Sequence, residues 1–300
     1  MCGIVGLYIK NPDLQSQLGA YLEPMLIEMS GRGPDSAGVA FYRDAVTDGK
    51  EKVTLYHPDL EFDWSAIVKG IDQSLQIKTS EVIRFNHCVM TIDGPSGAVR
   101  DWLSENHPSI RVMSVGNTIE IYKDMGLPKD VAAQFNIRDL NGTHALGHTR
   151  MATESAVTTE HSHPFSTGED LCLVHNGSMS NHNRMRQWLR RHCDIEFQTD
   201  NDTEVAAGYF TYRLREGATL KEALEAGLKD LDGFYTFAIG TRDGFAVMRD
   251  PIAAKPAVLA ETDDWVAMAS EYCSIAPLPG ADKATIWEPA PATMYTWGEA

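Results

Sequence analysis

The chain has 300 residues, of which 43% are hydrophobic, so it can bury a large core as one large domain or two ordinary ones. Its formal net charge of -16 argues against nucleic acid or an anionic membrane as a main partner, and no apolar run is long enough for a transmembrane helix. The N-terminus lacks the basic and apolar segments of a signal peptide, and the five cysteines are spread without a CxxC pair, so we expect a cytoplasmic protein with reduced thiols.

The first residues predict a strand over 3–9 that carries a nucleophile. Cys2 follows an initiator Met of the kind that cytosolic processing removes before a small side chain, which would make Cys2 the terminal residue. A terminal cysteine combines a thiolate with an α-amine that titrates at about 7.7–8 and can carry a proton. Gly3 would let a substrate approach the backbone closely. The alternative is an ordinary buried strand whose preceding residue is a cysteine.

Helical spacing of apolar residues predicts a helix over 14–29, which Pro24 interrupts or bends. A glycine-rich turn over 30–38 then leads into a strand over 38–43. The turn is either a loop that merely needs its glycines or a part of a site.

Residues 44–140 have a different pattern, which predicts an inserted α+β subdomain. We expect strands over 52–57, 83–92, 109–115 and 118–123, and helices over 64–75 and 95–105. No nucleophile lies beside a base in this segment, so packing or contact with a partner is its expected role.

Strands are expected over 143–150 and 171–177, the second of which ends in a turn. A helix over about 181–192 follows, then a helix that residues 200–204 cap and that runs to about 215, and a helix over 219–230. The remainder predicts strands over 234–241, 244–249, 257–260, 265–269, 284–288 and 293–297, with a short helix over 271–276. No repeat or long linker divides the chain, so we expect one domain over 2–300 that contains the insertion. The helix over 181–192 is basic, through Arg184, Arg186, Arg190 and Arg191, and is either a solvated face or a docking face for an acidic partner.

Five histidines lie within about thirty residues and invite comparison with a metal site. They are His144, His148, His161, His163 and His175. Their spacing matches no zinc pattern, so the sequence predicts no metal.

Several short motifs occur in a fixed order along the chain. They are Cys2-Gly3-Ile4-Val5-Gly6, Arg32-Gly33-Pro34-Asp35-Ser36-Ala37-Gly38, Gly147-His148-Thr149-Arg150, His175-Asn176-Gly177 and Asp202-Thr203-Glu204, followed by Asp232-Gly233-Phe234-Tyr235, Arg249-Asp250-Pro251, Lys255-Pro256 and Ser270-Glu271. Together they resemble the class II glutamine amidotransferase domain of the N-terminal-nucleophile hydrolase superfamily. The resemblance covers nearly everything outside 44–140, and it implies an α+β fold with a four-layer αββα sandwich.

The resemblance implies that Cys2 is the nucleophile and that its α-amine carries the proton. It assigns the oxyanion hole to the Asn176 side chain and the Gly177 backbone N–H, although Asn-Gly alone is also a common tight turn. Arg32 and Asp35 are expected to hold the loop beside the nucleophile.

For the ends of the substrate, the resemblance implies that Arg150 binds the α-carboxylate and that Asp202 pairs with the α-ammonium. Thr153 and His148 flank Arg150 and are weaker candidates for substrate contact. Asp202 has an alternative reading as a plain helix N-cap.

The activity implied is hydrolysis of L-glutamine to L-glutamate and ammonia. The sequence carries no acceptor domain, so we expect a chain that supplies ammonia to a synthase of glutamate synthase type, with flavin and iron–sulfur groups on partner chains and no cofactor on this one. The alternatives are the amidotransferase component of N-methylglutamate synthase, a catalytically silent scaffold in a complex, and another amide hydrolase of the same superfamily.

Overall fold

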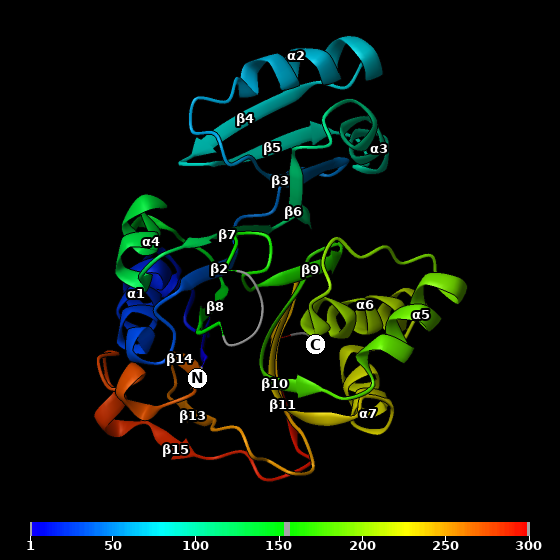
Figure 1. Cartoon of the computed structure of the whole chain (residues 1–300). Helices are drawn as coiled ribbons and strands as arrows, with labels where there is room; N and C mark the ends of the chain where they lie inside the picture. The colour runs from blue at the N-terminus through cyan, green and yellow to red at the C-terminus, as the bar shows by residue number, and fades with distance from the viewer. Residues whose placement is uncertain (1, 153–156, 299–300) are drawn as a thin grey trace.

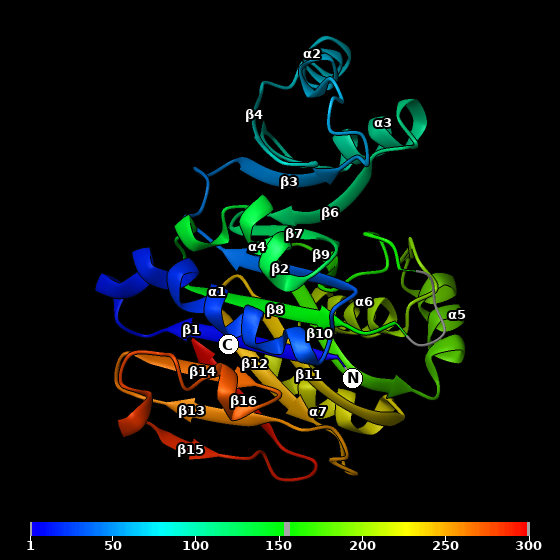
Figure 2. The same cartoon turned by 60° about the vertical axis from the view of Figure 1, so that its left-hand side comes forward.

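The computed structural model describes residues 2–152 and 157–298, and in that part of the chain the strands form three antiparallel sheets (Figures 1 and 2). The seven-stranded sheet consists, in spatial order, of β15 (Thr285–Trp287), β13 (Val258–Glu261), β14 (Trp265–Ala269), β1 (Gly3–Ile9), β8 (His144–Arg150), β2 (Ser36–Tyr42) and β7 (Ile119–Met125). The five-stranded sheet consists of β16 (Met294–Gly298), β12 (Gly244–Arg249), β11 (Gly233–Thr241), β10 (Leu171–Met179) and β9 (Phe165–Gly168). The four-stranded sheet consists of β4 (Thr79–Arg84), β5 (His87–Asp93), β3 (Lys50–Tyr56) and β6 (Arg111–Gly116).

The two larger sheets pack face to face through an apolar cluster to which both contribute. Ile4 and Leu146 come from the seven-stranded sheet, and Val174, Phe245 and Val247 come from the five-stranded sheet. Gly6 permits the close approach, because a Cβ there would lie 2.8 Å from the Phe245 ring. β1 is thereby packed closely against the five-stranded sheet.

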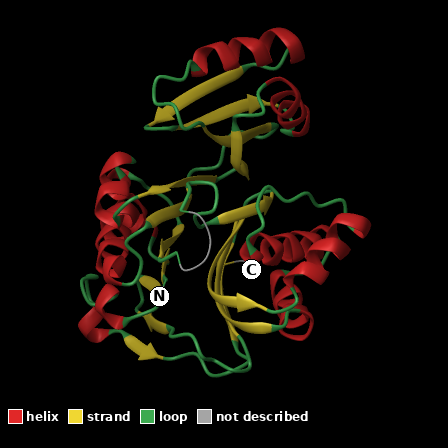
Figure 3. Cartoon of the chain, in the orientation of Figure 1, coloured by secondary structure: helices red, strands yellow, loops and turns green. Residues whose placement is uncertain are grey.

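Helices cover the outer faces of both large sheets (Figure 3). Two of them, α1 (Leu18–Glu28) and α4 (Pro128–Gln134), lie over the seven-stranded sheet. Three others, α5 (His182–His192), α6 (Asp202–Arg215) and α7 (Leu220–Asp230), cover the five-stranded sheet. A capping box between Thr219 and Glu222 begins α7.

The four-stranded sheet has its own apolar core with α2 (Trp64–Leu75) and α3 (Gly97–Asn106). In Figure 1 this unit stands above the rest of the molecule. β7 does not belong to it, because β7 pairs with β2 from Ser36↔Met125 to Tyr42↔Ile119. The separate sheet therefore spans 50–116, while the boundaries 44–140 for an inserted subdomain stay a prediction.

Several expected elements differ from the observed ones. The expected strand over 83–92 is wrong: β4 and β5 form a hairpin that turns at Phe85 and Asn86, and Phe85 takes a φ of 55°, which a bulky residue rarely adopts. The segment 14–29 begins with a 3₁₀ helix (Pro12–Gln17), and α1 then continues through Pro24 without interruption. The segment 271–276 contains only the 3₁₀ turn Tyr272–Ser274.

One strand, β9, and one α-helix, α4, were not expected from the sequence. β9 has only four residues, of which three are Ser, Thr and Gly, so it carries little alternation of apolar and polar residues. α4 has seven residues and begins at Pro128, which suits the first turn of a helix. No described helix is both long and apolar enough to cross a membrane.

Three fully buried histidines predict that acid destabilises the fold. Burial lowers the pKa of His87, His144 and His148 to about 3 each, so all three are neutral in the folded chain at neutral pH. In the unfolded chain they take up protons near pH 6.5, and the free energy of unfolding should therefore fall as the pH drops from about 6.5 toward about 3, by up to about 1.4 kcal/mol per histidine per pH unit.

Urea unfolding at pH 7.5, 6.5 and 5.5 measures this slope. The centroid of the His144 ring lies 4.0 Å from that of the Tyr42 ring, and His144→Phe keeps a ring in that place. The variant should reduce by about one the number of protons that the chain takes up on unfolding in acid, so its stability should depend less on pH. Equal stability at pH 7.5 and 5.5 would show that these histidines are protonated alike in both states.

Candidate active site around Cys2

Strand pairing brings distant motifs together at the beginning of β1. Gly3 lies opposite Thr149 in β8, and the Ser270 backbone N–H just after β14 donates to the Ile4 carbonyl at 2.9 Å. Gly3 has no room for a side chain, because a Cβ would lie 2.8 Å from the Thr149 Oγ1. The central position of β1 thus places Cys2 beside the ends of two neighbouring strands.

Cys2 is partly exposed, and its backbone carbonyl is held from two sides. Arg32 Nε donates to this carbonyl at 2.9 Å, and Asn176 Nδ2 donates to it at 3.1 Å. The guanidinium of Arg32 also forms an ion pair with Glu271. The thiol of Cys2 lies 3.8 Å from the Met151 carbonyl. Residue 2 is therefore fixed in position while its thiol stays accessible.

Asn176 and Gly177 lie within β10, which runs on to Met179. The reading of His175-Asn176-Gly177 as a tight turn is therefore wrong, and so is the expectation that this strand ends in a turn at 177. Asn176 is 4% exposed and donates a second hydrogen bond from Nδ2 to Ser270 Oγ at 3.0 Å. Gly177 has a φ of +138°, and a Cβ there would lie 2.0 Å from the Phe234 carbonyl oxygen, so glycine is required.

The glycine-rich turn packs against the end of β8. A Cβ on Gly33 would lie 2.4 Å from the Thr149 backbone. Asp35 binds the chain on both sides of Met151: its backbone N–H donates to the Arg150 carbonyl at 3.1 Å, and its carboxylate accepts from the Ala152 N–H at 2.8 Å. Arg150 ends β8 with 5% of its surface exposed. Thr153 lies outside the described residues.

Asp202 begins α6, but it is not the helix cap. The cap is Asn201, whose side chain accepts from the Thr203 N–H at 2.8 Å, so the N-cap reading of Asp202 is wrong. The Asp202 carboxylate accepts from the Met179 N–H at 2.9 Å and lies 3.6 Å from His175 Nδ1. Although burial raises its pKa, His175 and the Met179 N–H outweigh that effect and lower the pKa of Asp202 to about 2. Asp202 is therefore an anion at neutral pH.

The histidines near the site contact one another instead of converging on an ion. His148 donates from Nε2 to the His175 carbonyl at 3.1 Å and stacks on His163, with ring centroids 4.0 Å apart. The Thr203 hydroxyl forms hydrogen bonds with two of these rings, with His163 Nε2 at 2.8 Å and with His175 Nδ1 at 3.0 Å. Across residues 2–152 and 157–298, no group of three or more potential ligands is placed to hold a metal ion.

Sequence reasoning did not assign roles to Ser270, Glu271 and Thr203, which join these elements together. Ser270 is buried, and its Oγ accepts from both the Ile4 N–H at 2.9 Å and Asn176 Nδ2. The signals in the sequence were the motifs Ser270-Glu271 and Asp202-Thr203-Glu204, in which these three residues had no assigned role. The substrate contacts expected for Arg150, Asp202, Thr153 and His148 stay predictions.

Comparisons with known proteins identify the family of the chain. A family model described as a glutamine amidotransferase domain matches residues 148–277. The glutamine amidotransferase-like protein GlxB of Rhizobium meliloti is 52% identical over 298 residues, which cover 99% of this chain and 98% of that protein.

Two solved structures share the fold. The allosteric regulatory enzyme of purine biosynthesis superposes with a TM-score of 0.62, and the glutamine phosphoribosylpyrophosphate amidotransferase of B. subtilis with 0.58; both are 21% identical, and each match covers 99% of this chain. The chain spans 47% of each of these two proteins. The α+β fold is thus that of the amidotransferase part of such enzymes, and the identity to GlxB over nearly the whole length shows that this chain belongs to the class II glutamine amidotransferase family.

Proposed function

We propose that this chain hydrolyses L-glutamine to L-glutamate and ammonia. The observation that carries the proposal is the hydrogen bond between Asn176 Nδ2 and the carbonyl of Cys2, which puts an amide donor beside an accessible thiol. The Cys2 thiolate attacks the side-chain amide carbon and forms a γ-glutamyl thioester. Ammonia leaves with a proton from the α-amine, and water then releases glutamate with that amine as base. Asn176 and Gly177 stabilise the oxyanion.

The proposed architecture is the four-layer αββα sandwich of N-terminal-nucleophile hydrolases. It is supported by the apolar cluster that both large sheets share and by the helices on their outer faces. In this proposal residues 2–300 form one amidotransferase domain, and 44–140 form the inserted α+β subdomain.

Arg150 and Asp202 are proposed to bind the α-carboxylate and α-ammonium of glutamine. Arg150→Ala and Asp202→Asn should each weaken glutamine binding by about 10- to 150-fold, because each removes a charge-assisted contact worth roughly 1.5–3 kcal/mol. Steady-state kinetics of ammonia release should show the change in KM with a smaller change in kcat.

Arg138→Ala is a matched control, because this arginine is exposed and pairs with Glu23 on α1. A normal KM in the two site variants, combined with a lower kcat, would reassign these residues from binding to chemistry.

The ammonia is proposed to serve an acceptor synthase of glutamate synthase type on another chain, which would carry flavin and iron–sulfur groups. A partner is supported by exposed apolar side chains beside the site: Met125 is 50% and Leu127 39% exposed, and Gly126 between them donates to the Asp35 carbonyl at 2.9 Å. A complex of N-methylglutamate synthase type, with this chain as its amidotransferase component, is the alternative. A silent scaffold is the alternative without catalysis, and the presence of Cys2, Asn176 and Gly177 in one site argues against it.

If a partner governs activity, the isolated chain should release ammonia slowly. Adding the synthase chains that purify with it should increase the rate. The four-stranded unit is the proposed docking surface, and a deletion can remove it, together with the buried ion pair of Lys52 with Glu120 and the buried Tyr56 and Met113. Val46 N–H donates to the Asn117 carbonyl at 3.1 Å, so joining residue 47 to residue 117 should spare β7.

This deletion should abolish the stimulation by the partner while a basal rate remains, and the loss of Lys52 beside the buried Glu120 should lower the stability of the core. Full activity of the isolated chain, unchanged by any co-purifying protein, would identify a stand-alone glutaminase.

A further inference from the structure

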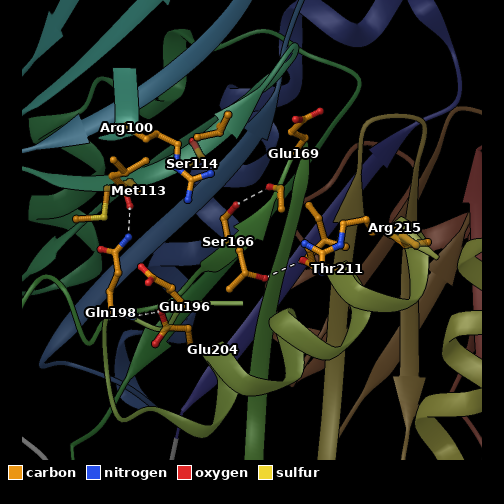
Figure 4. Close-up of a pocket in the computed structure, with 16 residues that line it drawn as sticks. Arg100, Met113, Ser114, Ser166, Glu169, Glu196, Gln198, Glu204, Thr211 and Arg215 are labelled. Carbon is orange, nitrogen blue, oxygen red and sulfur yellow. Dashed lines mark hydrogen bonds between the residues drawn. The ribbon is translucent and has the colours of Figure 1, made fainter. Parts of the chain in front are cut away.

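A cavity of about 420 Å³ lies between the four-stranded unit and the amidotransferase core (Figure 4). Its walls are residues 112–115 of β6, 166–169 at β9, Glu196 and Gln198 before α6, and residues of the first and last turns of α6. Cavities of this size suit small molecules. The proposed glutaminase reaction does not use it.

Hydrogen bonds hold the segments beside the cavity and link two of its walls. The Asp170 carboxylate accepts from the N–H groups of Thr118 and Ile119 at 2.8 and 3.0 Å, and the Asp170 N–H donates to the Val115 carbonyl at 2.9 Å. Gln198 Nε2 donates to the Val112 carbonyl across the cavity at 3.3 Å. The cavity is therefore formed before any ligand arrives.

Several polar side chains of the cavity are available to a ligand. Ser114 is 2% exposed, and its Oγ has no hydrogen-bond partner among the residues that the structure covers. Arg100, Glu169 and Glu196 stand exposed at the rim, and within the described ranges none of them forms an ion pair. A buried hydroxyl without a partner costs free energy that a ligand can recover.

We propose that this cavity binds a free α-amino acid with a basic side chain. The Arg100 guanidinium has the planar fork that binds a carboxylate, and Glu169, which lines the same cavity, offers an anion for the α-ammonium. Glu196 lies on the opposite side of the cavity in Figure 4 and receives the side-chain cation. Three carboxylates, of Glu169, Glu196 and Glu204, line the cavity against two guanidinium groups, which favours a ligand of net positive charge.

The test is isothermal titration calorimetry of the full chain with L-arginine, and with agmatine as the matched probe that lacks the carboxylate. L-arginine should bind saturably and at least tenfold more tightly than agmatine. Arg100→Ala should weaken L-arginine binding at least tenfold and leave agmatine binding nearly unchanged. Ser114→Ala should weaken both ligands by a smaller factor.

Two control variants test whether L-arginine binds in this cavity and not at the proposed glutamine site or on the charged surface. Asp202→Asn removes the carboxylate proposed for glutamine and should leave L-arginine binding as in the wild type. Lys69→Ala removes an exposed charge from α2 outside the cavity and should also leave it unchanged. L-arginine that fails to bind, binds no better than agmatine, or binds equally well to Arg100→Ala would overturn the proposal. Glutaminase activity plays no part in this experiment, so its absence would not affect the result.

Discussion

Replacing Cys2 with alanine is expected to abolish ammonia release from L-glutamine and to leave the fold intact. The thiol is partly exposed and lies 3.8 Å from the Met151 carbonyl, so its loss removes the proposed nucleophile without opening a core cavity. The backbone carbonyl of residue 2, which Arg32 and Asn176 hold, remains in the variant. Ammonia release by coupled assay and thermal unfolding measure the two expectations.

The proposed mechanism also requires a free α-amine on Cys2. Intact mass should therefore lack Met1, and inserting one alanine between Met1 and Cys2 should inactivate the enzyme although the thiol remains. Cys88→Ala is the matched control, because this thiol is buried in the four-stranded unit, away from Cys2. A fully active protein that retains Met1 would rule out the terminal amine as the base.

The elements that carry the site could be predicted because their signals are local. β1 is a continuous apolar segment, α6 begins with the polar residues of a helix start, and both were placed within a few residues. The same local signals misled at two points. Asn-Gly is typical of a turn, but Gly177 here serves the close contact with Phe234 within a strand. Asp202 suits an N-cap, but Asn201 immediately before it takes that role.

What could not be predicted depends on contacts between distant segments. Ser270 forms hydrogen bonds with Asn176, 94 positions away in the chain, and with Ile4, 266 positions away. No periodicity or spacing in the sequence indicates such pairings. The assignment of β7 to the seven-stranded sheet is of the same kind, since β7 continues a segment whose earlier strands form a separate sheet. Helical or strand character follows from neighbours in sequence, while sheet membership follows from packing.

Replacing Asn176 with alanine is expected to lower kcat by about 10²–10³-fold with little change in KM, because one of the two proposed oxyanion donors is lost. In the structure the Asn176 amide already has two acceptors, which limits how it could bind an oxyanion. Asn176 Nδ2 already donates to the Cys2 carbonyl and to Ser270 Oγ, which engages both of its hydrogens. A substrate oxyanion must therefore replace the Cys2 carbonyl as acceptor, while Ser270 keeps the amide oriented.

Two measurements separate the oxyanion role from a role in positioning Cys2. The rate of Cys2 alkylation by iodoacetamide should be nearly unchanged in Asn176→Ala, because Arg32 still holds the Cys2 carbonyl. Ser270→Ala, which keeps the donor but removes its anchor, should lower kcat by less than Asn176→Ala does. If Asn176→Ala slows alkylation as much as it slows turnover, the amide acts by placing the nucleophile; if kcat is unchanged, the oxyanion hole lies elsewhere.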